Sequence, residues 1–136
     1  MPNTQRPTPN AHMRLTRKEF DKVVERAIGR IPREIRAHLE NVLVTVQEKP
    51  SPELLEEMGL PPDYPLLGVY QGTSLMERSA VAPPVYPDMI LIFQGPLQEM
   101  CRTVRELERE IEITVVHEIA HFVGMTEEEL IELGYE

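Results

Sequence analysis

Thirteen prolines in 136 residues limit where this chain can form long regular elements. They cluster at positions 2–9, 50–65 and 83–96, and a proline lacks the backbone donor and the space that a helix interior requires. Long helices are therefore expected outside these clusters. The length suits one domain with a hydrophobic core, and we predict a disordered leader at 1–13 and a single domain at 14–136.

Apolar periodicity predicts the main elements between the proline clusters. Thr16 and Glu19 form a potential capping box that begins one amphipathic helix. A longer helix is predicted from about Val104 to Val123, with Gly124 as its left-handed end. Alternating or apolar runs predict three strands, at 42–46, 66–71 and 89–93. This order indicates an α+β fold with helices packed on a small mixed or antiparallel sheet.

The net charge of −9 is unevenly distributed along the chain. Residues 1–36 have a net charge of +5, whereas residues 99–136 have a net charge of −8. The acidic second region argues against a nucleic-acid substrate held through its phosphates. The only cysteine, Cys101, excludes an intramolecular disulfide and is expected to be a buried apolar residue. No apolar run has signal-peptide or membrane-spanning length, so we expect a cytoplasmic protein that does not bind membranes.

The sequence His117-Glu118-Ile119-Ala120-His121 is the strongest chemical signal in the chain. Residues four apart share one face of a helix, so the two imidazoles can supply two ligands of a tetrahedral zinc site. Glu118 lies where a carboxylate can accept a proton from a zinc-activated water. A shuffled chain of this composition would contain the pattern in about 1% of cases. The apolar neighbours favour the metal interpretation, because buried histidines need polar partners.

The third zinc ligand is less clearly indicated. A left-handed turn at Gly124 can bring the next residues back toward the metal, and Glu127 is the candidate at the position three residues later, with Glu128 or water as alternatives. The competing interpretation is structural, because acidic residues in a first helical turn favour the helix dipole and Glu129 completes a capping box with Thr126.

Three stretches resemble a mainly bacterial family of small zincin-like metallopeptidases with a minimal fold. They are GVYQGTSLMERS (68–79), PDMILIFQGPL (87–97) and TVVHEIAHFVGMTEEELIELGY (114–135). The resemblance implies a zincin helix, zinc bound through the two histidines, and peptidase activity. In zincins generally, a peptide substrate pairs with the edge strand before the active-site helix, which implies Met89–Phe93 here. Glu127 departs from the Asp or His often found at its position.

The leading hypothesis is a zinc-dependent peptidase with Glu118 as general base and a peptide or protein substrate. One alternative is a non-catalytic zinc-binding interaction domain, which would have no use for Glu118. A metal-dependent ribonuclease is the other, but the family with similar histidine spacing has three histidines and lacks the His-Glu pair. Tyr135 is either an oxyanion partner or, as we prefer, a residue packed against the last helix. The oligomeric state is not indicated.

Overall fold

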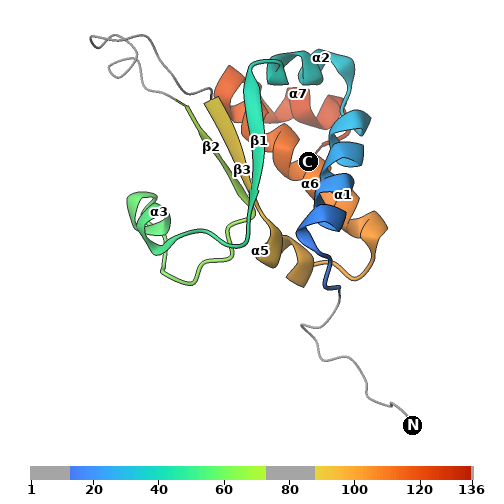
Figure 1. Ribbon diagram of the computed structural model, residues 1–136. Helices are drawn as coiled ribbons and strands as arrows, with labels where there is room; N and C mark the ends of the chain where they lie inside the picture. Colours follow the sequence, from blue (N-terminus) through green and yellow to red (C-terminus); the bar gives the residue numbers. More distant parts are fainter. Residues whose placement is uncertain (1–12, 73–87, 136) are drawn as a thin grey trace.

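The computed structural model describes residues 13–72 and 88–135. Helices pack on a three-stranded mixed sheet with the strand order β1-β3-β2 (Figure 1). The strands are β1 (Val42–Gln47), β2 (Gly68–Gln71) and β3 (Asp88–Phe93). The helices are α1 (Arg17–Arg30), α2 (Arg33–Arg36), α3 (Pro52–Glu57), α5 (Gln94–Glu99), α6 (Val104–Val123) and α7 (Glu127–Glu132), with a 3-10 turn at Ala37–Leu39. The predicted α+β class is confirmed.

The sheet is built around β3. β1 pairs with it in parallel, from Val42 opposite Asp88, and β2 pairs antiparallel, with Gly68 opposite Ile92. The last four residues of β3 are all buried, as expected for a strand covered on both faces. Because both sides of β3 are already paired, the implied role of Met89–Phe93 as an open edge for a peptide is wrong. Within the part of the chain that the structure describes, β1 and β2 are the edge strands.

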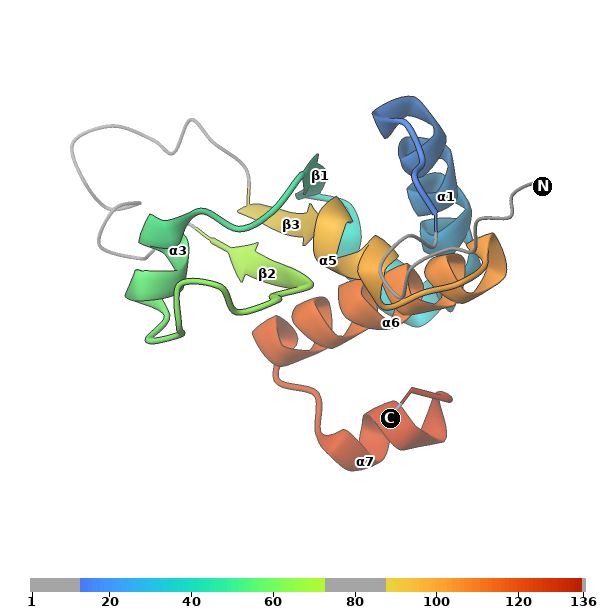
Figure 2. The same cartoon turned by 90° about the horizontal axis from the view of Figure 1, so that it is seen from below.

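The long helix α6 connects the sheet to the helical layer. It packs against α1 on one side and contacts β2 and β3 on another (Figures 1 and 2). Its buried side chains form a common core with α1, β3 and α7. They include Leu107, Ile111, Val115, Val116, Ile119 and Ala120. Burial of each large apolar side chain contributes about 1.5–3 kcal/mol to the free energy of unfolding.

The residues at both ends of α6 explain why the helix begins and ends there. The Oγ1 of Thr103 accepts the backbone N–H of Glu106 at 3.0 Å, which satisfies one free donor of the first turn. The Glu106 carboxylate accepts the N–H of Arg102 rather than that of Thr103, so the pair differs from a standard capping box. Gly124 ends the helix in the left-handed region at φ +82°. The helix predicted at 104–123 is thus confirmed, whereas α5 is a separate helix before it.

Two further predictions concern membrane-spanning helices and the N-terminal leader. No helix within residues 13–72 and 88–135 is long and apolar enough to cross a membrane. Residues 1–12 of the expected leader lie outside the described residues, as do residues 73–79 of the first family-like stretch. The leader and the single-domain boundary stay predictions.

Candidate metal centre

The two histidines lie in the last turns of α6. Buried neighbours, among them Val116 and Ala120, fix this part of the helix in the core. The ring centroids of His117 and His121 are 6.2 Å apart, with an interplanar angle of 81°. His117 is half-buried and His121 is exposed. Imidazoles on successive turns of one face can therefore approach one ion from the core side and the solvent side.

The Nε2 atom of His117 tests whether these residues suit a metal. It is buried, and within the described part of the chain it has no hydrogen-bond partner. Leaving a buried polar atom unpaired costs about 1–3 kcal/mol, so native proteins rarely keep one without a reason. A zinc ion bound to this nitrogen would remove that cost. The donor set, two imidazoles on one helical face, fits zinc.

Glu118 is held at the sheet edge rather than in solvent. Its Oε1 accepts the backbone N–H of Tyr70, in β2, at 3.0 Å. Burial raises the pKa of the Glu118 carboxyl, while the Tyr70 amide and the two nearby histidines act in the opposite direction. A carboxylate with a raised pKa, oriented by a backbone donor, has the properties of a general base.

A cleft of about 360 Å³ opens beside this group of residues. One wall is the chain from Tyr64 to Gly68, and the other is the face of α6 that carries Glu110, His117 and Glu118. The cleft therefore brings a substrate-sized space, an unpaired imidazole nitrogen and a base candidate together.

Glu127 is an exposed residue in the first turn of α7. The structure confirms the capping box beside it, in which Thr126 and Glu129 exchange hydrogen bonds. Among residues 13–72 and 88–135 there is no group of three or more His, Cys, Asp or Glu that could hold a metal. The structure thus brings the two histidines and Glu118 together but does not add Glu127 to them. Its role as a ligand stays a prediction.

Contacts between β2 and α6 add residues to the site that were not predicted from the sequence. Tyr70 stacks on Phe122 with ring centroids 4.2 Å apart, so the end of α6 is fixed against β2. At Gly68 a Cβ atom would lie 2.7 Å from the Cγ2 of Thr114, so only glycine permits this close approach. The strand pattern identified β2, but no sequence rule indicates which strand residue faces which helix residue.

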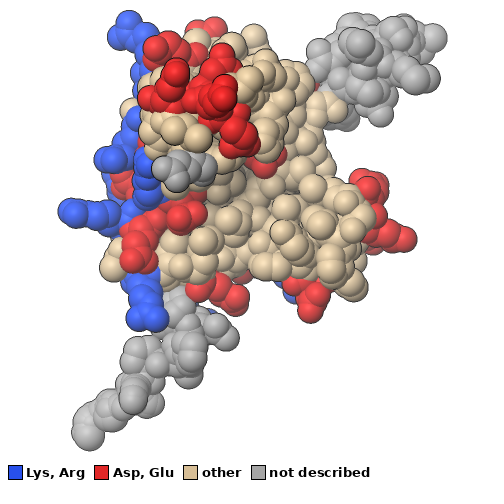
Figure 3. Space-filling model, turned by 180° about the vertical axis from the view of Figure 1, so that it is seen from behind, with Lys and Arg blue, Asp and Glu red and all other residues tan. Residues whose placement is uncertain are grey.

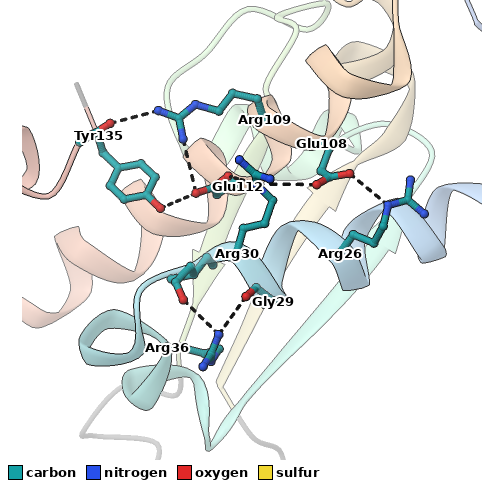
Figure 4. Close-up of polar contacts among 10 residues, drawn as sticks. Arg26, Gly29, Arg30, Arg36, Glu108, Arg109, Glu112 and Tyr135 are labelled. Carbon is teal, nitrogen blue, oxygen red and sulfur yellow. Dashed lines mark hydrogen bonds and ion pairs between the residues drawn. The ribbon is translucent and has the colours of Figure 1, made fainter.

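A second polar cluster lies on α6 away from this cleft (Figure 4). The buried carboxylate of Glu112 accepts bonds from Arg30, at 3.2 Å, and from the Tyr135 hydroxyl. Arg109 lies 3.4 Å from Glu112 and also bonds the carbonyl of Gly134. Tyr135 is therefore a packed residue and not an oxyanion partner.

Cys101 is also excluded from the site by its environment. The side chain is 1% exposed, as predicted for a small buried apolar residue. Burial, with smaller contributions from Glu110 and Glu106, raises the pKa of the thiol to about 11. A thiol of this kind stays protonated at neutral pH, whereas a zinc ligand must be a thiolate.

Comparison with known proteins identifies the family of this chain. A family model described as zincin-like metallopeptidase matches residues 39–135. A solved structure, a conserved hypothetical protein from Thermo thermophilus, is similar with a TM-score of 0.51 and 24% identity, over 86% of this chain and 98% of that chain. This structural similarity shows a shared fold alone. The search of curated proteins found no match. Because the family model covers most of its length, the chain belongs to the zincin-like metallopeptidase family.

Proposed function

We propose that this protein is a zinc-dependent peptidase that hydrolyses peptide bonds in a peptide or protein substrate. The observation that carries the proposal is the buried Nε2 of His117, which has no partner among the described residues and belongs to a residue lining the cleft beside Glu118. Family membership supports the same reaction class. Retention of a glutamate next to the first histidine also supports it, because a structural zinc site has no use for a base.

His117 and His121 would hold the zinc ion, with Glu127, Glu128 or water completing the ligands. A bound zinc ion would supply the Lewis acidity that polarises a carbonyl and makes water nucleophilic near neutral pH. The half-buried position of His117 keeps one side of the centre in the protein, while exposed His121 leaves the other side open to substrate. Catalytic zinc sites keep one position open in this way.

Glu118 would move the proton. Its Oε1 is engaged by the Tyr70 amide, so Oε2 is the oxygen that takes a proton from the attacking water. A carbon–oxygen bond then forms at the carbonyl, and the carbon–nitrogen bond breaks as Glu118 returns the proton to the leaving amine. The raised pKa of Glu118 brings the carboxyl closer to neutral pH, where both transfers are favourable.

A non-catalytic zinc-binding interaction domain is the second candidate. The observation in its favour is that, among the described residues, no third His, Cys, Asp or Glu is placed to hold a metal together with the two histidines. A site that lacks a firm third ligand binds zinc more weakly, which would lower turnover. The peptidase requires Glu118 as its general base, whereas the interaction domain does not.

The test is digestion of an unbiased peptide library by the zinc-loaded protein. Wild type should cleave, chelator-treated protein should not, and Glu118→Gln should lose at least about 100-fold of the rate while keeping its zinc. His117→Ala should lose metal and activity together. Cleavage that survives in Glu118→Gln would overturn the mechanism, and absence of cleavage with zinc fully bound would favour the interaction domain.

A further inference from the structure

A second hollow lies next to the cleft at the metal centre. That second space, also about 360 Å³, is lined by residues that follow β1, by residues at the start and end of α5, and by residues 62–65. Tyr64 and Pro65 line both hollows, so the two spaces are neighbours along this segment of the chain. We call these two neighbouring hollows the extended cleft. Their linings include His117 and Glu118 in the first hollow and Glu99, at the end of α5, in the second.

The walls of the extended cleft are acidic. Glu110 and Glu118 line the first hollow, and Glu48, Asp63 and Glu99 line the second. Lys49 is the one lysine or arginine that lines either space in the described part of the chain. Within those same residues, Glu48, Asp63, Glu99 and Glu110 form no ion pair. These carboxylates are therefore available to a ligand.

Charged side chains are unevenly distributed over the surface. In Figure 3 lysine and arginine side chains gather along one edge of the molecule, and acidic side chains form separate groups, among them one at the right and others along the lower border. The glutamates of α6 that lie nearest the basic edge are paired, since Arg26 and Arg30 contact Glu108 and Arg30 also contacts Glu112. These two glutamates of α6 are thus neutralised by arginine, in contrast to the carboxylates that line the second hollow.

Tyr64 adds a second feature that suits a cation. The residue is 43% exposed and lines both hollows. A lysine or arginine side chain can lie over an exposed tyrosine ring, with a gain of about 0.5–1 kcal/mol at such sites. The aliphatic part of the same side chain can pack against the prolines that line the second hollow, Pro50, Pro52, Pro62, Pro65 and Pro96.

Resting on the proposed function, we infer that the substrates are basic peptide segments, with lysine or arginine on one side of the cleaved bond. The peptide lies along the extended cleft, with the cleaved bond at Glu118 and the basic side chains between Tyr64 and the carboxylates of the second hollow. Electrostatic complementarity of this kind sets which partner binds and how fast it associates. Binding should accordingly weaken as salt screens the charges, over a Debye length of about 8 Å at physiological ionic strength.

The test measures binding, so that it does not depend on turnover. Zinc-loaded Glu118→Gln protein is titrated into fluorescent peptides of equal length that are lysine-rich, glutamate-rich or uncharged, and anisotropy gives Kd. The lysine-rich peptide should bind at least about tenfold more tightly than the uncharged one. Adding Glu48→Gln, Asp63→Asn and Glu99→Gln should remove about tenfold of that affinity, since each exposed charge contributes a modest share.

The matched control removes three exposed carboxylates outside both hollows: Asp21→Asn, Glu25→Gln and Glu132→Gln. It changes the net charge by the same amount and should alter Kd by less than about twofold. Equal weakening in both triple variants would overturn the inference, as would equal affinity for lysine-rich and uncharged peptides. Tight binding of lysine-rich peptides that wild type never cleaves would support the extended cleft as a binding site for basic peptides while refuting the peptidase. Cleavage of uncharged and lysine-rich peptides at equal rates would support the peptidase and refute the preference for basic peptides.

Discussion

Helix α6 carries two groups of polar side chains that differ in how well their atoms are paired. Toward its N-terminal half, Glu112 is 3% exposed and receives bonds from Arg30 and Tyr135, with Arg109 close by. Toward its C-terminal end, His117 keeps a buried nitrogen with no partner among the described residues. Both groups lie on the same helix and beside the same core. The first is complete as it stands, whereas the second has an atom that a ligand would satisfy.

The difference separates a structural role from a functional one. Fully paired buried polar groups make a fold specific, and removing one partner is costly. An unpaired group lowers stability and is kept where chemistry uses it. Variants in the two groups should therefore change different quantities.

His117→Ala should give the largest effect, and it should appear in zinc affinity. Loss of residues that merely orient a zinc ligand costs about 10–100-fold in affinity, so loss of a ligand itself should cost more than about 100-fold. Without zinc, the free energy of unfolding should change by less than about 1 kcal/mol, because the variant also removes an unpaired buried atom. Competition with a fluorescent zinc chelator and denaturant unfolding measure the two quantities. Unchanged zinc affinity in His117→Ala would contradict the functional role assigned to the unpaired histidine, and with it the difference from the Glu112 group.

Glu112→Gln should show the opposite behaviour. Removing one partner of a buried ion pair costs about 3–5 kcal/mol, but Arg30 and Arg109 are 60% and 46% exposed, so water can take over part of their solvation. We expect a loss of about 2 kcal/mol in unfolding free energy and no change in zinc affinity. Glu108→Gln, at a more exposed position, is the matched control and should cost less. A large fall in zinc affinity in Glu112→Gln would show that the two groups are coupled.

Tyr135→Phe sharpens the same contrast through pH. Burial, followed by the bond to Glu112, raises the pKa of Tyr135 above its ordinary value. A raised pKa in the folded state means that its stabilising contribution is present below about pH 10 and is lost as pH rises further. Wild type should thus lose unfolding free energy more steeply above about pH 10 than Tyr135→Phe, by at most about 1.4 kcal/mol per pH unit. Cys101 also titrates in this range but is common to both proteins. Parallel pH profiles would contradict the prediction.

The smallest effects belong to α7. Glu129→Ala removes one half of the capping box with Thr126 and should cost about 1 kcal/mol of stability, with zinc affinity unchanged. Glu127→Ala should leave the cap intact and weaken zinc binding if Glu127 is the third ligand. Isothermal titration with zinc compares the two variants. Equal zinc affinity in Glu127→Ala and wild type would indicate that Glu128 or water is the third zinc ligand.

The sequence predicted those features that depend on local pattern. The bounds of α6 follow from apolar periodicity, a capping threonine and Gly124, all of which act within a few residues. The spacing of His117 and His121 likewise needed only helical geometry. The central position of β3 could not be predicted, because a crossover in strand order depends on contacts distant in sequence. The hydrogen bond between Tyr70 and Glu118 could not be predicted either, because the two residues are 48 positions apart in the sequence.

The central claim is that His117 and His121 bind one zinc ion, and X-ray absorption at the zinc edge of the loaded protein tests it most directly. The claim predicts two imidazole nitrogens at about 2.0–2.1 Å, with oxygen in the remaining positions. A first shell without imidazole, or one containing sulfur at about 2.3 Å, would contradict it, because the only cysteine is the buried Cys101.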